Sequence, residues 1–253
     1  MRENTKIPIK TPDEIEVMRE GGRKLVKVKK ELLEAVKEGV RASEIDNLAD
    51  KLIEKEGGEA SFKMVSGYSW ATCVNINEGV VHGIPKKEIV FKRNDVVSVD
   101  VGMFYKGFHT DTSFTKAIGS NPNLERFLGS GRSALEKAIQ EARIGNRIYD
   151  ISQAIESTMR KNGYSPIRAL VGHGVGRALH EEPQVPCFTN GNREESPEIP
   201  LGAVFAVEVM YAMGSPDVKI ASDGWTISTS DGTISGLFED TVVVSPKGPL
   251  VIT

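Results

Sequence analysis

Two of the four histidines in the chain lie close together in the segment VGHGVGRALHEEPQVP, residues 171–186. Glycines stand on both sides of His173, and an acidic pair follows His180 directly. Imidazole nitrogens bind metal ions and transfer protons near neutral pH. Glycines allow the backbone to approach another group closely. We therefore expect this loop-like segment to contribute to a chemical site.

Two acids interrupt stretches that are otherwise apolar. Asp100 lies in VVSVDVG and Glu208 lies in AVFAVEVMYA. Both stretches are typical of strands with two buried faces, so both carboxyl groups are expected to be buried. A buried carboxylate is costly unless it is paired or binds a metal ion.

Asp111 follows Asp100 after one hairpin turn. If that turn is centred between Tyr105 and Lys106, the two aspartates face each other directly, with Cβ atoms about 4.5–5.5 Å apart. Two ionised carboxylates about 4 Å apart repel by roughly 4 kcal/mol at an effective dielectric constant near 20. A shared cation would reverse the sign of that energy, and a shared proton is the alternative.

Glu239, in GLFEDTVVVS, is a further acid in a β-branched strand. Its neighbour Asp240 should point to the opposite face, so only one of the two can face inward. Four acids and His173 together predict a dinuclear metal site. Each signal alone has an ordinary explanation: a strand acid is often at an edge or in a salt bridge, a single histidine is often structural, and glycines mark turns. Their joint occurrence favours the metal site.

Two similar helix pairs are predicted to position these residues. Residues 12–56 form two helices, the first capped by Thr11 and the second opening at Ser43. Residues 123–163 repeat the arrangement with a break at Gly145, and Asp46 and Asp150 take corresponding places near the start of each second helix. The alternative is that two generic amphipathic pairs look alike. We interpret them as two related halves, about 10–120 and 121–253, of one catalytic unit, 1–253.

Strands are predicted to follow each helix pair. The segment 93–119 alternates and is rich in valine, and residues 202–213, 224–245 and 250–253 supply the later strands. We therefore expect an α+β fold with a curved, mainly antiparallel sheet. Helices would cover its outer face and leave the inner face free for the site.

Bulk composition excludes several classes of protein. The chain has 253 residues, 39% hydrophobic and 26% charged, with a net charge of −3. This charge predicts neither sequence-specific nucleic-acid binding nor binding to an anionic membrane. Two cysteines are too few for a disulfide framework, and the first residues have no apolar signal region. We expect a soluble, cytoplasmic protein.

The chain resembles a known family in VVHGIP, DVGMFYKGFHTDTSFT, GHGVGRALHEEPQV, FAVEVM and FEDTVVV. These motifs, which extend over nearly the whole chain, are similar to those of the type I methionine aminopeptidases of the pita-bread fold, peptidase family M24. The resemblance implies metal-dependent removal of the N-terminal methionine from nascent proteins, with preference for a small second residue. It also implies the short bacterial form, which lacks an extra N-terminal domain, acts as a monomer and works near the ribosome.

The resemblance also assigns residues to roles. Asp100 would bind one divalent ion, His173 and Glu208 the other, and Asp111 and Glu239 both. The ions would be Co²⁺, Mn²⁺, Fe²⁺ or Zn²⁺, with Glu208 as the proton shuttle. His82 and His180 would flank the scissile bond as catalytic and substrate-binding groups. The substrate's methionine side chain would contact Tyr68, Cys73, His82 and Trp225.

Several positions depart from the family pattern. Ser69-Trp70 stands in GYSWATC, Leu179 replaces a common phenylalanine, and Phe62 and Val65 also differ. These residues concern the shape of the methionine pocket and leave the ligand set intact.

Three rival interpretations remain. The first is a pita-bread exopeptidase that cleaves before proline, and the second is a catalytically inactive pita-bread binding module. The third sets the resemblance aside and is a structural protein with buried, salt-bridged acids.

Overall fold

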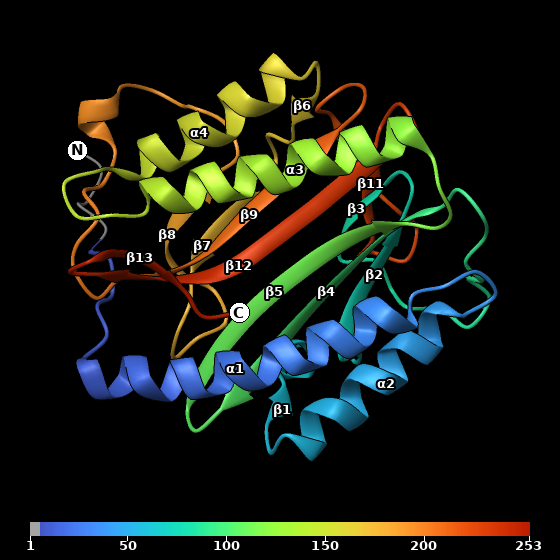
Figure 1. Cartoon of the computed structure of the whole chain (residues 1–253), viewed down its shortest axis with the longest axis horizontal. Coiled ribbons are helices and arrows are strands. Elements are labelled where there is room, and N and C mark those ends of the chain that lie inside the picture. Colours follow the sequence, from blue (N-terminus) through green and yellow to red (C-terminus); the bar gives the residue numbers. More distant parts are fainter. Residues whose placement is uncertain (1–5) are drawn as a thin grey trace.

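The structure is a computed structural model, and it describes residues 6–253. The predicted catalytic unit begins at residue 1, and its first five residues lie outside the described part. Within the described residues, four α-helices lie on one side of a ten-stranded sheet (Figure 1). The helices are α1 (Pro12–Ala35), α2 (Ala42–Lys55), α3 (Pro122–Glu141) and α4 (Ile148–Lys161).

The large sheet has the order β1-β4-β5-β12-β9-β7-β8, with β2 paired to β4, β6 to β9 and β13 to β12. Its strands are β1 (Glu59–Ala60), β2 (Thr72–Ile76), β4 (Val96–Tyr105), β5 (Phe108–Ala117), β6 (Ser165–Pro166), β7 (Val171–Gly174), β8 (Glu181–Pro186), β9 (Val204–Ala212), β12 (Ser235–Ser245) and β13 (Gly248–Val251). A second sheet, ordered β10-β11-β3, contains β3 (Gly79–Val81), β10 (Val218–Ile220) and β11 (Ile227–Thr229). Every paired strand among the described residues is antiparallel, as predicted.

The two helix pairs are built alike. Both α2 and α4 have 14 residues and follow an arginine, Arg41 or Arg147. The arginine amide donates to a carboxylate three residues later, over 2.7 Å to Glu44 and 2.8 Å to Asp150. This contact satisfies an N–H that the helix itself leaves free. The repeated chemistry agrees with two related halves (Figure 1).

The predicted cap of α2, Ser43, was wrong by two residues, since the cap is Arg41, and part of the predicted alignment between the halves was also wrong. Ser43 lies inside the first turn of α2, because the backbone bends out of the helix at Arg41. Glu44, rather than Asp46, therefore corresponds to Asp150. The Asp46 carboxylate instead accepts hydrogen bonds from the backbone amides of residues 71 and 72, at the start of β2.

The start of α1 is confirmed. The Thr11 hydroxyl accepts from the Glu14 amide, and Pro12 occupies the first turn. One face of α1 buries an apolar stripe against the sheet, and Gly22 allows the closest approach. A Cβ atom on Gly22 would lie 2.1 Å from the carbonyl oxygen of Ile252, so a side chain there would force the helix away from the chain's C-terminal residues.

The histidine-rich segment is more regular than predicted. It forms β7 and β8, joined by residues 175–180, and the pairing shifts register between His173 and Gly174. Bulges of this kind change the direction of a side chain beside functional sites. Among residues 6–253, no helix combines the length and the apolar character that crossing a membrane requires.

Candidate active site

Five ligand-type side chains occupy two neighbouring rows on one face of the large sheet. In the first row, Asp100 pairs with Ser113, which pairs with Glu239, which pairs with Glu208. The second row lies two residues along, where Asp111 is opposite Gly102 and His173 is opposite Ala206. Since residues two apart on a strand share a face, the rows bring together five residues from β4, β5, β7, β9 and β12. We call the four acids of this set the carboxylate cluster: Asp100, Asp111, Glu208 and Glu239.

The predicted direct pairing of Asp100 with Asp111 is wrong. The hairpin turn is centred between Lys106 and Gly107, both of which have positive φ, 48° and 91°. Such a two-residue turn matches the twist of the strands and sets the register. The two aspartates are therefore diagonal neighbours on the same face. Gly102 leaves room for this arrangement, because a Cβ atom there would lie 3.2 Å from Oδ1 of Asp111.

The prediction for Glu239 and Asp240 is confirmed. Glu239 is 2% exposed, and its side chain lines the same cavity as the other three acids of the carboxylate cluster. Asp240 points to the opposite face, where its carboxylate accepts hydrogen bonds from Lys29 over 2.8 Å and from the Thr112 hydroxyl over 3.2 Å.

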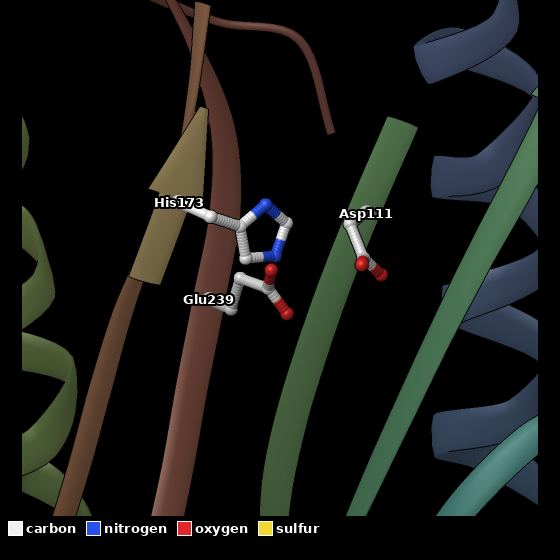
Figure 2. Close-up of side chains that lie close together, drawn as sticks. All are labelled: Asp111, His173 and Glu239. Carbon is white, nitrogen blue, oxygen red and sulfur yellow. The ribbon is translucent and has the colours of Figure 1, made fainter. Parts of the chain in front are cut away.

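His173 is oriented as a ligand through Nε2. Its Nδ1 lies 2.9 Å from the carbonyl oxygen of Gly174, which can only accept, so Nδ1 carries the proton. Nε2 lies 3.5 Å from Oε1 of Glu208. One ligand atom from each of Asp111, His173 and Glu239 falls within 4.8 Å of the others. Figure 2 shows these three side chains converging from three strands.

The electrostatics of the cluster are unfavourable without a cation. Burial raises the pKa of Asp100 to about 7. Burial, followed by repulsion from neighbouring carboxylates, raises the pKa of Asp111, Glu208 and Glu239 well above their usual values. Burial also lowers the pKa of His173 to about 4, so its imidazole is neutral and available as a ligand.

The hydrogen bonding of the cluster is also incomplete. Oδ1 of Asp100 and Oε1 of Glu239 are buried and have no hydrogen-bond partner among residues 6–253. Buried polar atoms without partners are rare and point to an ion or other ligand. Oxygen donors with one imidazole suit divalent cations such as Mn²⁺, Fe²⁺, Co²⁺ or Zn²⁺. The residues present therefore fit a divalent metal centre.

The cluster lines a cavity of about 120 Å³, and all ten predicted site residues line it. His82 directly follows β3 and has a left-handed backbone, with φ of 56°. His180 directly precedes β8, and its ring centroid lies 4.5 Å from that of His173. Desolvation lowers the pKa of both His82 and His180, which favours their neutral forms.

Aromatic and apolar groups form the wall of the cavity. The Tyr68 ring contacts Trp225 edge-on, with centroids 5.0 Å apart. The Tyr68 hydroxyl donates to the carbonyl oxygen of Thr72 over 2.9 Å. Burial raises the pKa of the Cys73 thiol well above its usual value, so Cys73 is an uncharged part of the wall.

Four further residues line the cavity: Phe62, Val65, Val81 and Leu179. Phe62, Val65 and Leu179 stand at positions where the sequence departs from the family pattern. That departure was the signal that could have placed them in the site. Val81 carried no such signal beyond its place before His82. Trp70, the other departure, packs edge-on against Tyr68 with centroids 5.2 Å apart.

Comparisons with known proteins agree with this geometry. The family model described as metallopeptidase family M24 matches residues 16–246. The chain is 38% identical over 248 residues to a methionine aminopeptidase of Clostridium perfringens, and the match covers 98% of each chain. It is 37% identical over 245 residues to methionine aminopeptidase 1 of Bacillus subtilis, covering 96% of this chain and 98% of the relative.

The structure is similar to that of a methionine aminopeptidase from Thermotoga maritima. The TM-score is 0.94 at 38% identity, covering 98% of this chain and 99% of the other. This agreement confirms the predicted pita-bread fold and the family resemblance in the motifs. The chain belongs to metallopeptidase family M24.

Proposed function

We propose that this chain is a methionyl aminopeptidase that removes the N-terminal methionine from nascent proteins and prefers a small second residue. The observation that carries the proposal is the convergence of four acids and His173 in the lining of one small cavity, beside aromatic and apolar side chains. The names of the full-length relatives support the same activity.

The ligand roles in this proposal follow the two rows. Asp100, at one end of the first row, would hold one metal ion. Glu208 and His173, at the other end of the rows, would hold a second ion, and Asp111 and Glu239 lie between them and would contact both. Four carboxylates balance the charge of two divalent cations. When bound, such ions lower the pKa of a shared water and polarise the scissile carbonyl.

The remaining chemistry belongs to side chains around the cluster. Glu208, whose pKa is raised by burial, would move a proton from the attacking water to the leaving amine. His180 is neutral near pH 7 and would donate a hydrogen bond to the developing oxyanion. His82, which also lines the cavity, would hold the scissile amide.

The cavity wall would select the first side chain. Tyr68, Cys73, His82 and Trp225 surround a narrow space together with Leu179. Methionine is unbranched and flexible, so it can fill such an irregular apolar space. Sulfur also makes favourable contacts with aromatic rings, which the cavity offers in Tyr68 and Trp225.

The free amino group of the substrate would set the position of cleavage. Its pKa is about 7.7–8.0, so the neutral form is accessible near pH 7 and can bind close to Asp100. A formyl or acetyl cap removes this contact and adds bulk. Correct placement of the first peptide bond is a proximity effect.

The test compares three peptides with the same metal-loaded protein. Met-Ala-Ser should be cleaved, and formyl-Met-Ala-Ser should be cleaved at least about 100-fold more slowly, a difference of roughly 2.7 kcal/mol. Ala-Pro-Ala should not be cleaved. Similar rates on capped and free peptides would contradict an exopeptidase, and preference for Ala-Pro-Ala would support cleavage before proline instead.

We further propose that residues 1–253 form one catalytic unit that acts as a monomer in the cytoplasm, on peptides that emerge from the ribosome. The net charge of −3 is consistent with a peptide substrate rather than nucleic acid or a membrane surface. Metal titration after chelation should reach full activity at two ions per chain and identify which of Co²⁺, Mn²⁺, Fe²⁺ or Zn²⁺ supports it. Saturation at one ion would contradict the dinuclear assignment.

A further inference from the structure

The loop of residues 175–180 carries His180 and Leu179 into the cavity. Few backbone hydrogen bonds hold this loop to the rest of the molecule. The Val175 amide donates to Val204 over 3.1 Å, and the carbonyl oxygen of Gly176 accepts from the His109 amide over 2.7 Å. Both bonds lie at the start of the loop, so the part that carries His180 needs other contacts to fix it.

Lys10, which lies near the N-terminal end of the chain, supplies such a contact. Its backbone is fixed, because its amide donates to Gly202 over 2.8 Å and the next residue caps α1. Its side chain is only 1% exposed and donates to Oε2 of Glu181 over 2.6 Å. An ammonium group buried this deeply is costly unless it is paired, so the geometry of the pair is strongly constrained.

Glu181 transmits this contact to the loop. It is bonded directly to His180, and its side chain is 10% exposed. While Oε2 accepts from Lys10, Oε1 accepts from the Ala178 amide over 3.2 Å. One carboxylate thus joins the N-terminal segment, the loop and the first residue of β8.

Gly176 makes room for Lys10. A Cβ atom at this position would lie 2.3 Å from Cε of Lys10 and 2.8 Å from its Nζ. A side chain there would push the lysine out of its place. Gly176, the third glycine of the histidine-rich segment, therefore makes room for the Lys10 side chain rather than for the carboxylate cluster.

A second contact between the same segments is weaker. Glu14, on α1, pairs with Arg177 of the loop, but the two side chains are 22% and 54% exposed. Exposed ion pairs contribute little, whereas loss of one partner from a buried pair leaves an uncompensated charge. Lys10 is therefore the principal side-chain anchor of this loop.

We propose that Lys10 is a positioning residue for His180, holding Glu181 and with it the loop that places the imidazole beside the carboxylate cluster. The inference rests on the proposed function, in which His180 contacts the reacting carbonyl. Lys10 itself does not line the cavity. Its effect on the reaction would pass through the loop alone.

The first test is Lys10→Met, assayed on Met-Ala-Ser with bound metal measured on the same sample. Displacing a catalytic group by about 1 Å can cost about 10²-fold in rate, so we expect kcat to fall about tenfold to a hundredfold. Metal content should stay at the wild-type value, because no proposed ligand is touched. KM should change by less than about threefold, since Leu179 is the one wall residue of the methionine pocket on this loop.

Arg193→Met is the control for loss of an ion pair away from the cavity. Arg193 forms a two-point ion pair with Asp150, over 2.7 Å at each contact, and neither residue lines the cavity. This variant should lower the melting temperature without changing kcat at a temperature where the protein is folded. An equal loss of kcat in Arg193→Met and Lys10→Met would mean that any ion-pair loss has this effect, and would overturn the inference.

The second test places Lys10→Met in a His180→Ala background. If Lys10 acts through His180, the double variant should have the same kcat as His180→Ala alone, within about twofold. A further tenfold loss would show that Lys10 acts by another route. A wild-type value of kcat in the single Lys10→Met variant would also overturn the inference.

A third variant tests the inference if Lys10→Met does not fold. Lys10→Met/Glu181→Gln removes both charges, so no unpaired carboxylate stays buried, and the same loss of kcat with unchanged metal is expected. Normal kcat in this variant would overturn the inference. A wild-type chain inactive on Met-Ala-Ser would overturn the proposed function and the inference together, whereas an active wild type with unaffected variants would overturn the inference alone.

Discussion

The carboxylate cluster and the imidazoles of His82 and His180 face the same cavity but are held in different ways. The four acids lie within the long central strands β4, β5, β9 and β12, whose backbones are paired on both sides. His82 and His180 lie just outside strands, at the end of β3 and the start of β8. The acids are therefore positioned by the sheet, and the imidazoles by loops.

Individual side chains help to hold these loops. The amide of Gly83, which follows His82, donates to Oδ1 of Asn75 over 2.9 Å. Glu181, which follows His180, accepts from Lys10 over 2.6 Å. The comparison teaches that metal binding should be insensitive to most substitutions other than those of the ligands, while turnover should depend on individual anchors of the loops.

The largest expected effect comes from the cluster itself. Asp111→Asn should remove the ligand that we propose both ions share and lower activity by at least about a thousandfold, since metal ions supply several kcal/mol of transition-state stabilisation. Bound metal, measured on the purified variant, should fall to one ion or none. The control is Asp240→Asn, which changes an acid on the opposite face of β12 and should keep both metal and activity. Two tightly bound ions with near-normal turnover in Asp111→Asn would contradict the ligand assignment.

The next largest effect distinguishes His82 and His180 from the proposed metal ligands. His82→Ala and His180→Ala should each retain the metal and lose turnover by about 10²–10³, the usual result of removing one hydrogen bond to the transition state. Metal analysis and kcat on Met-Ala-Ser check both statements. Loss of metal with either substitution would mean that the histidine is a ligand. Metal binding would then depend on a loop as well as on the sheet.

A third effect concerns the stability of the metal-free protein. Burial raises the pKa of Asp100 from its ordinary 3.8 to about 7, so the folded state holds its proton over a range where the unfolded state has lost it. The contribution of this group to the free energy of unfolding should therefore be largest below about pH 4 and fall as pH rises towards 7. We expect the melting temperature of chelated protein to drop by roughly 5–10 °C over that range as a result of this group.

Metal-loaded protein provides the comparison for this measurement. Bound cations keep the carboxylates ionised in the folded state, so the decline contributed by the cluster should disappear. Asp100→Asn without metal should likewise show a shallower decline than the chelated wild type. A chelated wild type and a chelated Asp100→Asn variant whose melting temperatures change in the same way from pH 4 to pH 7 would contradict the burial of a protonated Asp100 carboxyl group.

The smallest effect concerns the cavity wall. Loops carry Trp70 and Leu179, so the shape of the methionine pocket should vary more readily than the cluster. We expect Met-Ala-Ser to be cleaved about tenfold faster than Leu-Ala-Ser, because small differences in apolar side chains contribute about 1–3 kcal/mol. Equal kcat/KM values for the two peptides would point to a broader aminopeptidase.

Local sequence signals determined much of the fold. The acids in apolar, β-branched stretches predicted strands with one chemically special face, because a carboxylate in such a place needs a partner. The alternation of Glu239 and Asp240 predicted which of the two faces inward, since the strand period is two. Helix signals also located both helix pairs, although Ser43 was mistaken for a cap because serine is a good cap in isolation.

Only the tertiary structure decided the register and the long-range neighbours. The Asp100–Asp111 geometry depended on left-handed backbone at Lys106 and Gly107, and the sequence allowed a turn centred one residue earlier. The direct pairing of Glu208 with Glu239, and of Lys10 with Glu181, joins segments that no local pattern relates. Such contacts follow from how the whole sheet and its helices pack, because a strand's own pattern specifies its faces but not the residues of other strands that lie beside it.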